Sequence, residues 1–348
     1  MNSYSWIRHS LQFKRPSGTS RGILTDKPSW FLTYAESDWV YPALGEVSII
    51  PGLSADPIDR IESKLNEVCA NLNAELPTET TGFPAITFAL EMLEADIKAK
   101  GSKVFYPTND FNTGVAEIKI NGLIWMGDPL FMLEQIKEKM EQGFRCLKLK
   151  IGAIDFEKEL KILASIRQEI NAIDLEIRVD ANGAFTPGDA LEKLKTLSEF
   201  DIHSIEQPIA PKQWDEMAAL CSTSPLDIAL DEELIGLNAL EEKRRALDTI
   251  RPQYIILKPS LLGGLKACDV WISEAEQRGI KWWLTSALES NIGLNAIAQY
   301  AHEKDVSMPQ GLGTGSLYTN NIDSPLYIHR QFLMMNPNHI WNLKPLNL

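Results

Sequence analysis

From about residue 117 onward, short apolar runs alternate with segments of helical periodicity, and this alternation constrains the fold of the 348-residue chain more than any other feature. The apolar runs are typical of strands, as in "EIKINGLIWMG" (117–127), "RCLKLKIG" (145–152) and "QYIILKPSLLGG" (253–264). Helical periodicity is clear in "DFEKELKILASIRQEI" (155–170). Such alternation indicates a parallel sheet, and about seven βα units in one stretch favour a closed barrel.

Polar side chains recur near the ends of successive strand candidates, at intervals of 25 to 30 residues. They are Lys150, Asp180, Glu206, Asp231, Lys258 and Ser286. In a (β/α) barrel the active site lies at the C-terminal ends of the strands. The recurring polar residues therefore predict an active site at that end of the barrel.

Three of these residues, Asp180, Glu206 and Asp231, are expected on consecutive strands and hence close together. Three adjacent anions repel one another unless a cation holds them, and an all-oxygen set suits Mg²⁺. Alternatively, each acid caps a helix, a reading that suits Asp231 in "LDEELIG" taken alone. Because the three stand in register, we expect one divalent cation, Mg²⁺, for which Mn²⁺ could substitute.

Lys148 and Lys150 are predicted to share one face of a strand, opposite Leu147 and Leu149, because side chains alternate along a strand. On a solvated strand this would be an ordinary polar face. In a barrel, Lys150 would face Lys258 across the mouth, where neighbouring positive charge favours a neutral lysine that acts as a base. Lys148 would tune and orient Lys150. Such a site suits removal of a proton α to a carboxylate, because the resulting enediolate needs a Lewis acid.

The N-terminal part of the chain has a different rhythm and is predicted to form a separate α+β unit over 1–115. Strand-like segments flank a turn-rich loop, "RPSGTSRG" (15–22), and amphipathic helices are expected over 55–73 and 83–101. The barrel is then expected to span the middle of the chain.

The C-terminal boundary of the barrel is weakly marked. We expect the barrel over 116–322, with an eighth strand of poor strand character in "PQGLGTGSLY" (309–318). The segment 323–348 is predicted to return to the N-terminal unit.

Composition limits the partners and the compartment. A net charge of −13 argues against a nucleic-acid binder, while a local basic pocket for a small-molecule acid stays possible. The four cysteines lack C-x-x-C spacing and predict buried thiols rather than zinc ligands or disulfides. No apolar run is long enough to cross a bilayer, so we expect a cytoplasmic protein that acts on a small-molecule carboxylate. The sequence leaves the oligomeric state open.

Five short motifs together resemble the enolase superfamily, specifically its muconate-lactonizing-enzyme-like branch. They are "KLK" (148–150), "VDAN" (179–182), "IEQPI" (205–209), "LDEE" (230–233) and "LKPS" (257–260). The N-terminal unit, with "GE" at 45–46, is similar to the capping domain of that family. The resemblance implies an α/β fold: a (β/α)8-type barrel, modified to (β/α)7β, with an N-terminal α+β capping domain.

Within that branch the sequence most resembles the o-succinylbenzoate synthases of menaquinone biosynthesis. This implies Mg²⁺-dependent syn dehydration of 2-succinyl-6-hydroxy-2,4-cyclohexadiene-1-carboxylate to 2-succinylbenzoate through an enediolate. It implies that Lys150 takes the α-proton and then protonates the departing hydroxyl. Lys258 would stay protonated and stabilise the enediolate. Asp180, Glu206 and Asp231 would hold the Mg²⁺ that binds the substrate carboxylate.

Substrate selection is expected in the last barrel loops. Ser286 lies in "SALESNIG" (286–293), and Gly313 and Gly315 lie in "QGLGTGSLYTNN" (310–321). Glycines there would let backbone N–H groups approach an anion such as the succinyl carboxylate. A tight turn without a ligand is the alternative for the same pattern.

Three further residues are candidates for substrate binding. Ser20 and Arg21, in the turn-rich loop of the N-terminal unit, would reach into the pocket or else lie in a surface loop without contact. Arg178 shares a strand face with Asp180. For Arg178 an interior ion pair is the preferred role over direct contact with substrate.

Rival functions stay open at this point. A racemase of N-succinylamino acids or a dipeptide epimerase would use the same two lysines on opposite faces of a carbanion. Dipeptide epimerases of this family carry a D-x-D motif that "GLGTGSLY" (311–318) lacks, which disfavours dipeptides. The K-x-K motif also permits muconate cycloisomerization. A catalytically silent barrel that acts as a binding protein is disfavoured by the intact set of lysines and acids.

Overall fold

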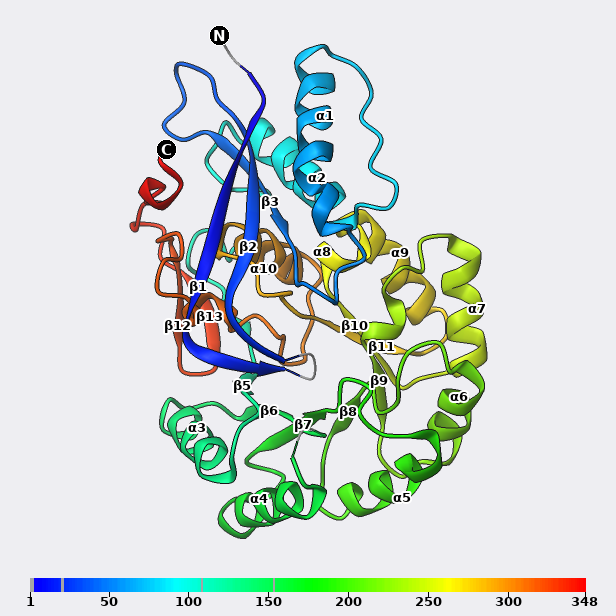
Figure 1. Cartoon of the computed structure of the whole chain (residues 1–348). Helices are drawn as coiled ribbons and strands as arrows, with labels where there is room; N and C mark the ends of the chain where they lie inside the picture. Colours follow the sequence, from blue (N-terminus) through cyan, green and yellow to red (C-terminus); the bar gives the residue numbers. More distant parts are fainter. Residues whose placement is uncertain (1–2, 20–21, 108, 153) are drawn as a thin grey trace.

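A computed structural model describes residues 3–19, 22–107, 109–152 and 154–348. Its main sheet is parallel, with strand order β11-β10-β9-β8-β7-β6-β5, and curls into a barrel (Figure 1). The strands are β5 (Gly122–Ile124), β6 (Cys146–Lys150), β7 (Glu176–Asp180), β8 (Ser204–Glu206), β9 (Ile228–Leu230), β10 (Tyr254–Leu257) and β11 (Lys281–Leu284). The predicted (β/α)7β barrel is confirmed.

The eighth position of the barrel is filled by single bridges rather than by a strand. Gln310 bridges Ile120 and Gly311 bridges Thr285, both in parallel. The glycines of this segment weaken strand character, as its sequence indicates. The two bridges close the barrel between β5 and β11.

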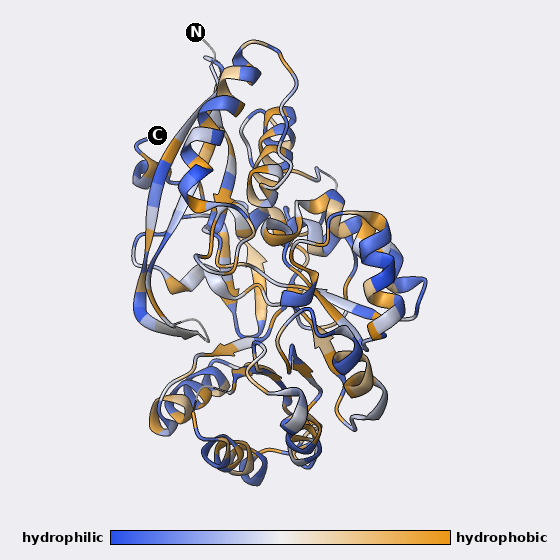
Figure 2. Cartoon of the chain, turned by 45° about the vertical axis from the view of Figure 1, so that its right-hand side comes forward, coloured by the Kyte–Doolittle hydropathy of each residue, from blue (hydrophilic) through white to orange (hydrophobic). Residues whose placement is uncertain are grey.

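Helices cover the outside of the barrel (Figure 1). They are α3 (Pro129–Glu141), α4 (Phe156–Glu169), α5 (Pro187–Ser198), α6 (Trp214–Thr223), α7 (Leu240–Ile250) and α9 (Leu265–Glu276). Two more helices, α8 (Pro259–Leu262) and α10 (Asn291–Glu303), are almost entirely buried where the barrel meets the N-terminal part of the chain. Asp128 caps α3 by accepting from the N–H groups of Leu130 and Phe131, and Asp155 caps α4 by accepting from Lys158. Figure 2 shows hydrophilic and hydrophobic faces on these outer helices.

Side-chain alternation along β6 orients the two lysines of "KLK". Leu147 and Leu149 point outward into the core formed with the surrounding helices. Lys148 and Lys150 pair with Arg178 and Asp180 of β7 and lie on the inner face. The predicted placement of both lysines inside the barrel is confirmed.

The N-terminal unit is an antiparallel sheet packed on two helices, as predicted for a capping domain. It contains β1 (Ser5–Thr19), β2 (Gly22–Tyr34), β3 (Ala43–Ser48), η1 (Ile58–Arg60), α1 (Ile61–Asn73) and α2 (Pro84–Lys98). Its separate core includes Trp30, Leu32, Leu65 and Ile86. In Figure 1 the β1–β2 hairpin extends over the barrel mouth.

Two local predictions were wrong. The turn-rich loop 15–22 is mostly strand, because β1 runs to Thr19 and resumes pairing with β2 after a register shift between Gln12 and Ser17. Backbone pairing with β2 outweighs the turn propensity of proline, serine and glycine there. The apolar run 117–127 is divided between two sheets rather than forming one strand.

The C-terminal segment forms a small antiparallel sheet with the first part of the run 117–127. The sheet contains β4 (Ile118–Lys119), β12 (Leu326–His329) and β13 (Phe332–Met335) in the order β12-β13-β4. The final turn, η4 (Lys344–Leu346), lies against β1. The tail thus contacts the start of the barrel and the capping sheet, and the boundaries at 115 and 322 stay predictions.

All four cysteines are buried and free. Among the described residues, no helix combines the length and apolar character needed to cross a membrane.

Candidate active site

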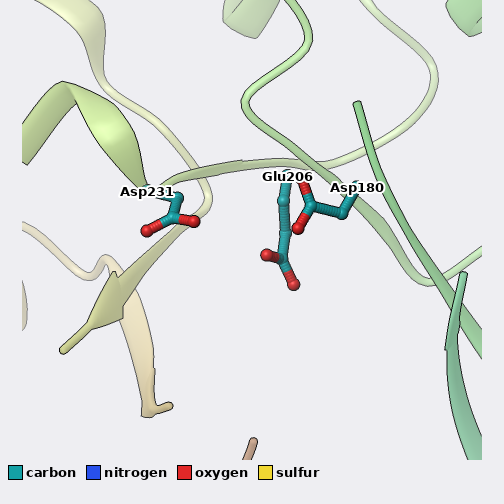
Figure 3. A group of neighbouring side chains, drawn as sticks. All are labelled: Asp180, Glu206 and Asp231. Carbon is teal, nitrogen blue, oxygen red and sulfur yellow. The ribbon is translucent and has the colours of Figure 1, made fainter. Parts of the chain in front are cut away.

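The three predicted acids meet at the mouth of the barrel (Figure 3). Asp180 and Glu206 end β7 and β8 as paired residues, and Asp231 directly follows β9. One carboxylate oxygen of each lies within 4.8 Å of the others, and all three side chains are buried. The parallel register of consecutive strands therefore produces the predicted cluster.

Lys150 and Lys258 lie on opposite sides of this acid cluster. The Nζ of Lys150 is 2.6 Å from Asp180 Oδ2, and the Nζ of Lys258 is 2.5 Å from Asp231 Oδ2. They come from β6 and the end of β10, and three strands separate these two in the sheet. The predicted pair of facing lysines is thus present.

Lys148 lies deeper in the barrel than Lys150 and bridges two of the acids. Its Nζ is 2.9 Å from Asp180 Oδ2 and also donates a hydrogen bond to Glu206 Oε2. Lys148 and Lys150 therefore share one oxygen of Asp180. This contact gives Lys148 a means to orient Lys150, as the sequence predicts.

The electrostatics of the cluster reflect burial competing with opposite charge. Burial raises the pKa of Glu206 to about 8, an effect that Lys148 opposes and that Asp180 and Asp231 reinforce. Although burial favours the protonated form of Asp180, Lys148 and Lys150 hold its pKa below the usual range. Burial likewise disfavours the charge on Lys148, but the surrounding carboxylates outweigh it and raise the pKa of Lys148.

The cluster fits a divalent cation. Glu206 Oε1 is buried and has no hydrogen-bond partner within the described part of the chain. A buried oxygen without a donor is costly, and a cation would satisfy it. All-carboxylate oxygen donors suit Mg²⁺. Asp180, Glu206 and Asp231 could therefore hold one metal ion.

A cavity of about 180 Å³ lies above the acids, between the barrel and the capping domain. From the barrel, Lys148, Lys150, Lys258, Ser286, Gly313 and Thr314 line it. From the capping domain, Ile23, Leu24, Ile50 and Leu53 line it. The cavity thus joins charged groups on the barrel side to apolar groups on the cap side, which suits a small organic acid.

Comparison with known proteins identifies the family of this fold and site. Residues 132–330 match the family described as enolase C-terminal domain-like. An o-succinylbenzoate synthase of Desulfotalea psychrophila is 51% identical over 358 residues, covering 93% of this chain and 96% of that protein. The chain belongs to the enolase superfamily.

Two more similarities describe its place in the superfamily. The crystal structure of MenC from Desulfotalea psychrophila superposes with a TM-score of 0.86 at 47% identity, covering 96% of this chain and 99% of that one. An N-succinyl-L-Arg/Lys racemase of Bacillus cereus is 26% identical over 259 residues, covering 73% of this chain and 68% of that protein.

In this member of the superfamily, Ser286 belongs to a buried chain of hydroxyl groups. Its Oγ donates to Glu289 Oε2 at 2.5 Å and accepts from Thr314 Oγ1 at 2.8 Å. Ser260 donates to the other oxygen of Glu289. Burial raises the pKa of Glu289, while the two serines oppose the shift. Glu289 thus fixes the orientation of a hydroxyl that lines the cavity.

Sequence reasoning missed Glu289, Thr314 and Asn182 as functional residues. Asn182 Oδ1 accepts from Lys150 at 2.8 Å, and Asn182 Nδ2 donates to Glu232 Oε1 at 2.9 Å. Asn182 has a φ of 45°, a left-handed conformation that asparagine tolerates. The asparagine in "VDAN" was the available signal, whereas the contact of Glu289 with Ser260 joins the ends of two different strands.

The remaining candidates lie in different surroundings. Arg178 is fully buried below Asp180, where it pairs with Glu176 at 2.7 Å and lies 4.4 Å from the ring centroid of Trp283. These contacts support the preferred role as an interior ion pair. Gly315 lies in η3 (Thr314–Leu317), and its Cα is packed so closely that an added Cβ would meet Asn291 at 2.5 Å.

Ser20 and Arg21 lie outside the described residues. Their role in substrate binding stays a prediction.

Proposed function

We propose that the chain is a dehydratase that converts 2-succinyl-6-hydroxy-2,4-cyclohexadiene-1-carboxylate to 2-succinylbenzoate, an o-succinylbenzoate synthase activity. The observation that carries this proposal is 51% identity to a protein of that name over 93% of the chain. The lysines and acids gathered at the mouth of the barrel support it. The pathway context would be menaquinone biosynthesis.

In this proposal Asp180, Glu206 and Asp231 hold Mg²⁺, which supplies a Lewis acid for the substrate carboxylate. Their mutual distances and the unpartnered oxygen of Glu206 support this assignment. The same geometry could take Mn²⁺. One cation per chain is expected.

Lys150 is proposed as the base that removes the α-proton and then returns a proton to the departing hydroxyl. Syn elimination places both groups on one face of the ring, so a single lysine can serve both steps. Asn182 and Asp180 hold the Nζ of Lys150 at 2.8 Å and 2.6 Å. Lys258, on the other side of the cavity, would remain protonated and stabilise the anion that forms. Burial opposes the charge of Lys258, but Asp231 raises its pKa, which supports that role.

Ser286, Thr314 and Gly313 are proposed to contact the succinyl group, since all three line the cavity beside Lys258. The apolar capping residues would exclude water from the ring. A small-molecule carboxylate substrate and a cytoplasmic location belong to the same proposal.

The test is a turnover assay with the purified protein, Mg²⁺ and the cyclohexadiene carboxylate, following loss of the diene absorbance. We expect turnover that EDTA abolishes and added Mg²⁺ restores. A folded, metal-loaded protein that leaves the diene unchanged would refute the proposal.

N-succinylamino acid racemization is a second candidate. It is favoured by the 26% identity to the Bacillus cereus racemase and by two lysines on opposite sides of the cavity. Exchange of the α-proton of N-succinylamino acids in D₂O, detected by NMR, tests it. The exchange should depend on both Lys150 and Lys258.

A further inference from the structure

A second cavity, of about 520 Å³, lies beside the catalytic one. It is bounded by the distal part of β1, by α3, and by segments that follow Gly313 and Ile328. The two cavities share a wall, formed by Asn121, Leu123, Trp125, Gly313 and Thr314. A ligand in the second cavity would therefore lie next to the catalytic pocket.

The second cavity is basic in a strongly acidic protein. Lys14, Arg15, Lys139 and Arg330 line it, whereas Glu138 is the acid among its described lining residues. Glu138 forms an ion pair with Arg15, whose Nη1 lies 3.8 Å from Glu138 Oε2. Within the described part of the chain, no carboxylate oxygen lies within 4.0 Å of the charged groups of Lys14, Lys139 or Arg330. With a net charge of −13 overall, this local excess of cations favours anions at one place on the surface.

The walls of this cavity are aromatic. Trp125, Phe131 and Phe144 line it. The Nζ of Lys139 lies 5.1 Å from the ring centroid of Phe144 and donates to Gln142 Oε1 at 3.1 Å. Burial lowers the pKa of the Lys139 ammonium, so an arriving carboxylate would stabilise its charge. Flat apolar walls with cations at the rim match a ring that carries carboxylates.

We propose that the second cavity is a separate binding site for a cyclic or aromatic dicarboxylate. Its natural occupant would be the substrate or the product of the neighbouring pocket, and this identification of the occupant rests on the proposed function. A dianion approaching a protein of charge −13 is repelled at long range, and a basic site next to the pocket raises its local concentration.

The experiment uses phthalate, a ring dicarboxylate, as the probe. Calorimetric titrations at low ionic strength compare the Mg²⁺-loaded wild type with Lys14→Gln/Lys139→Gln. The matched control is Lys158→Gln/Lys161→Gln, which removes the same charge from α4, away from both cavities. Each titration is repeated with EDTA in place of Mg²⁺. Phthalate that binds in the second cavity should still bind without the metal, whereas phthalate that binds to the metal should not.

We expect phthalate binding by the wild type and the control in both conditions, weakened about tenfold in Lys14→Gln/Lys139→Gln. In turnover assays the same variant should lose about three- to tenfold in kcat/KM at low ionic strength, and the loss should shrink as salt is added. A parallel titration with inorganic phosphate tests whether the aromatic walls contribute to binding. Equal affinities of the wild type for phosphate and for phthalate would overturn the proposal of a cyclic or aromatic ligand.

The inference fails if Lys14→Gln/Lys139→Gln binds phthalate as tightly as the wild type does. It stands, and the proposed function fails, if the phthalate results are as expected but the protein does not dehydrate the cyclohexadiene. The two failures are therefore distinguishable, because the binding readout does not depend on turnover.

Discussion

Two buried clusters of lysines and carboxylates lie close together in this protein, and their hydrogen bonding differs. The catalytic cluster consists of Lys148, Lys150, Lys258, Asp180, Glu206 and Asp231. The interface cluster, where the capping domain meets the barrel, consists of Lys27, Glu46, Glu289 and the serines around them. Both clusters are almost completely removed from solvent.

In the interface cluster, neutral donors and acceptors satisfy the charges. Glu46 accepts from the N–H groups of Ser290 and Gly293, each at 2.9 Å, and from the hydroxyl of Ser290 at 2.6 Å. Lys27 donates to the hydroxyls of Ser29 and Ser48, each at 2.8 Å. These bonds join β2 and β3 of the cap to the start of α10 in the barrel.

In the catalytic cluster, charges mainly contact other charges, and Glu206 Oε1 has no partner in the described structure. A buried charge that neutral groups already satisfy gains little free energy from binding a ligand. A buried charge without a hydrogen-bond partner gains more, because the ligand satisfies it. The comparison teaches that burial and charge alone do not mark a site. The pattern of hydrogen bonding separates a structural junction from the proposed metal site.

The largest expected effect is on turnover, from Lys150→Ala. Loss of the general base should lower kcat by about 10³-fold, within the range for acid–base catalysis. The variant should still fold and bind Mg²⁺, because Lys150 is not a proposed ligand and Asp180 keeps its contact with Lys148. Steady-state dehydration assays check this. Turnover within tenfold of wild type would remove Lys150 from its assigned role.

A substitution in the interface cluster should lower the stability of the folded protein. Glu46→Ala removes one of two carboxylates near the buried ammonium of Lys27 and leaves the N–H groups of Ser290 and Gly293 without an acceptor. The free energy of unfolding should fall by about 3–5 kcal/mol, because several buried donors lose their acceptor at once. Urea denaturation measures it. A loss below about 1 kcal/mol would show that the junction tolerates donors without an acceptor.

Glu289→Gln tests the link between the clusters, because Glu289 orients Ser286 in the catalytic cavity. An amide keeps one acceptor oxygen but replaces the other with a donor, so one serine hydroxyl must turn away. We expect kcat/KM to fall about tenfold, equivalent to about 1.4 kcal/mol. Thr314→Val, which removes only the outer hydroxyl, should cost less. Equal values for the wild type and Glu289→Gln would contradict this positioning role.

The smallest effect concerns Asp56, a buried acid of the capping domain. Its carboxylate accepts from the N–H of Ala85 at 3.1 Å, and burial raises its pKa to about 7 from an ordinary value near 3.8. Between these values the folded state retains a proton that the unfolded state has lost, so this group makes stability fall as pH rises from about 4 to 7. Asp56→Asn keeps a helix-capping oxygen without the charge.

We expect Asp56→Asn to gain about 1 kcal/mol at pH 8 and almost nothing at pH 4, since helix-terminal N–H groups partly offset the cost of the charge. Urea denaturation across this pH range measures the difference. A gain that is the same at both pH values would contradict the shifted pKa.

The sequence was sufficient for the barrel and the catalytic cluster because both follow from local periodicity. The alternation in "RCLKLKIG" places both lysines inward, and the spacing of Asp180, Glu206 and Asp231 places them on consecutive strands. Motif resemblance then supplied the chemistry.

Features that depend on distant segments were not predictable. The division of 117–127 between two sheets depends on β13, more than 200 residues later. The contact of Glu289 with Ser260 joins the ends of two neighbouring strands, and the strand at 15–19 depends on pairing with β2. Propensity alone reports none of these partners.

The most direct test of the account is a calorimetric titration of Mg²⁺ into the wild type, Glu206→Gln and Glu46→Gln. We predict one ion per chain in the wild type, binding lost in Glu206→Gln, and binding retained in Glu46→Gln despite its lower stability. Retention of Mg²⁺ binding in Glu206→Gln, or its loss in a folded Glu46→Gln, would contradict the assignment of the metal site to the catalytic cluster.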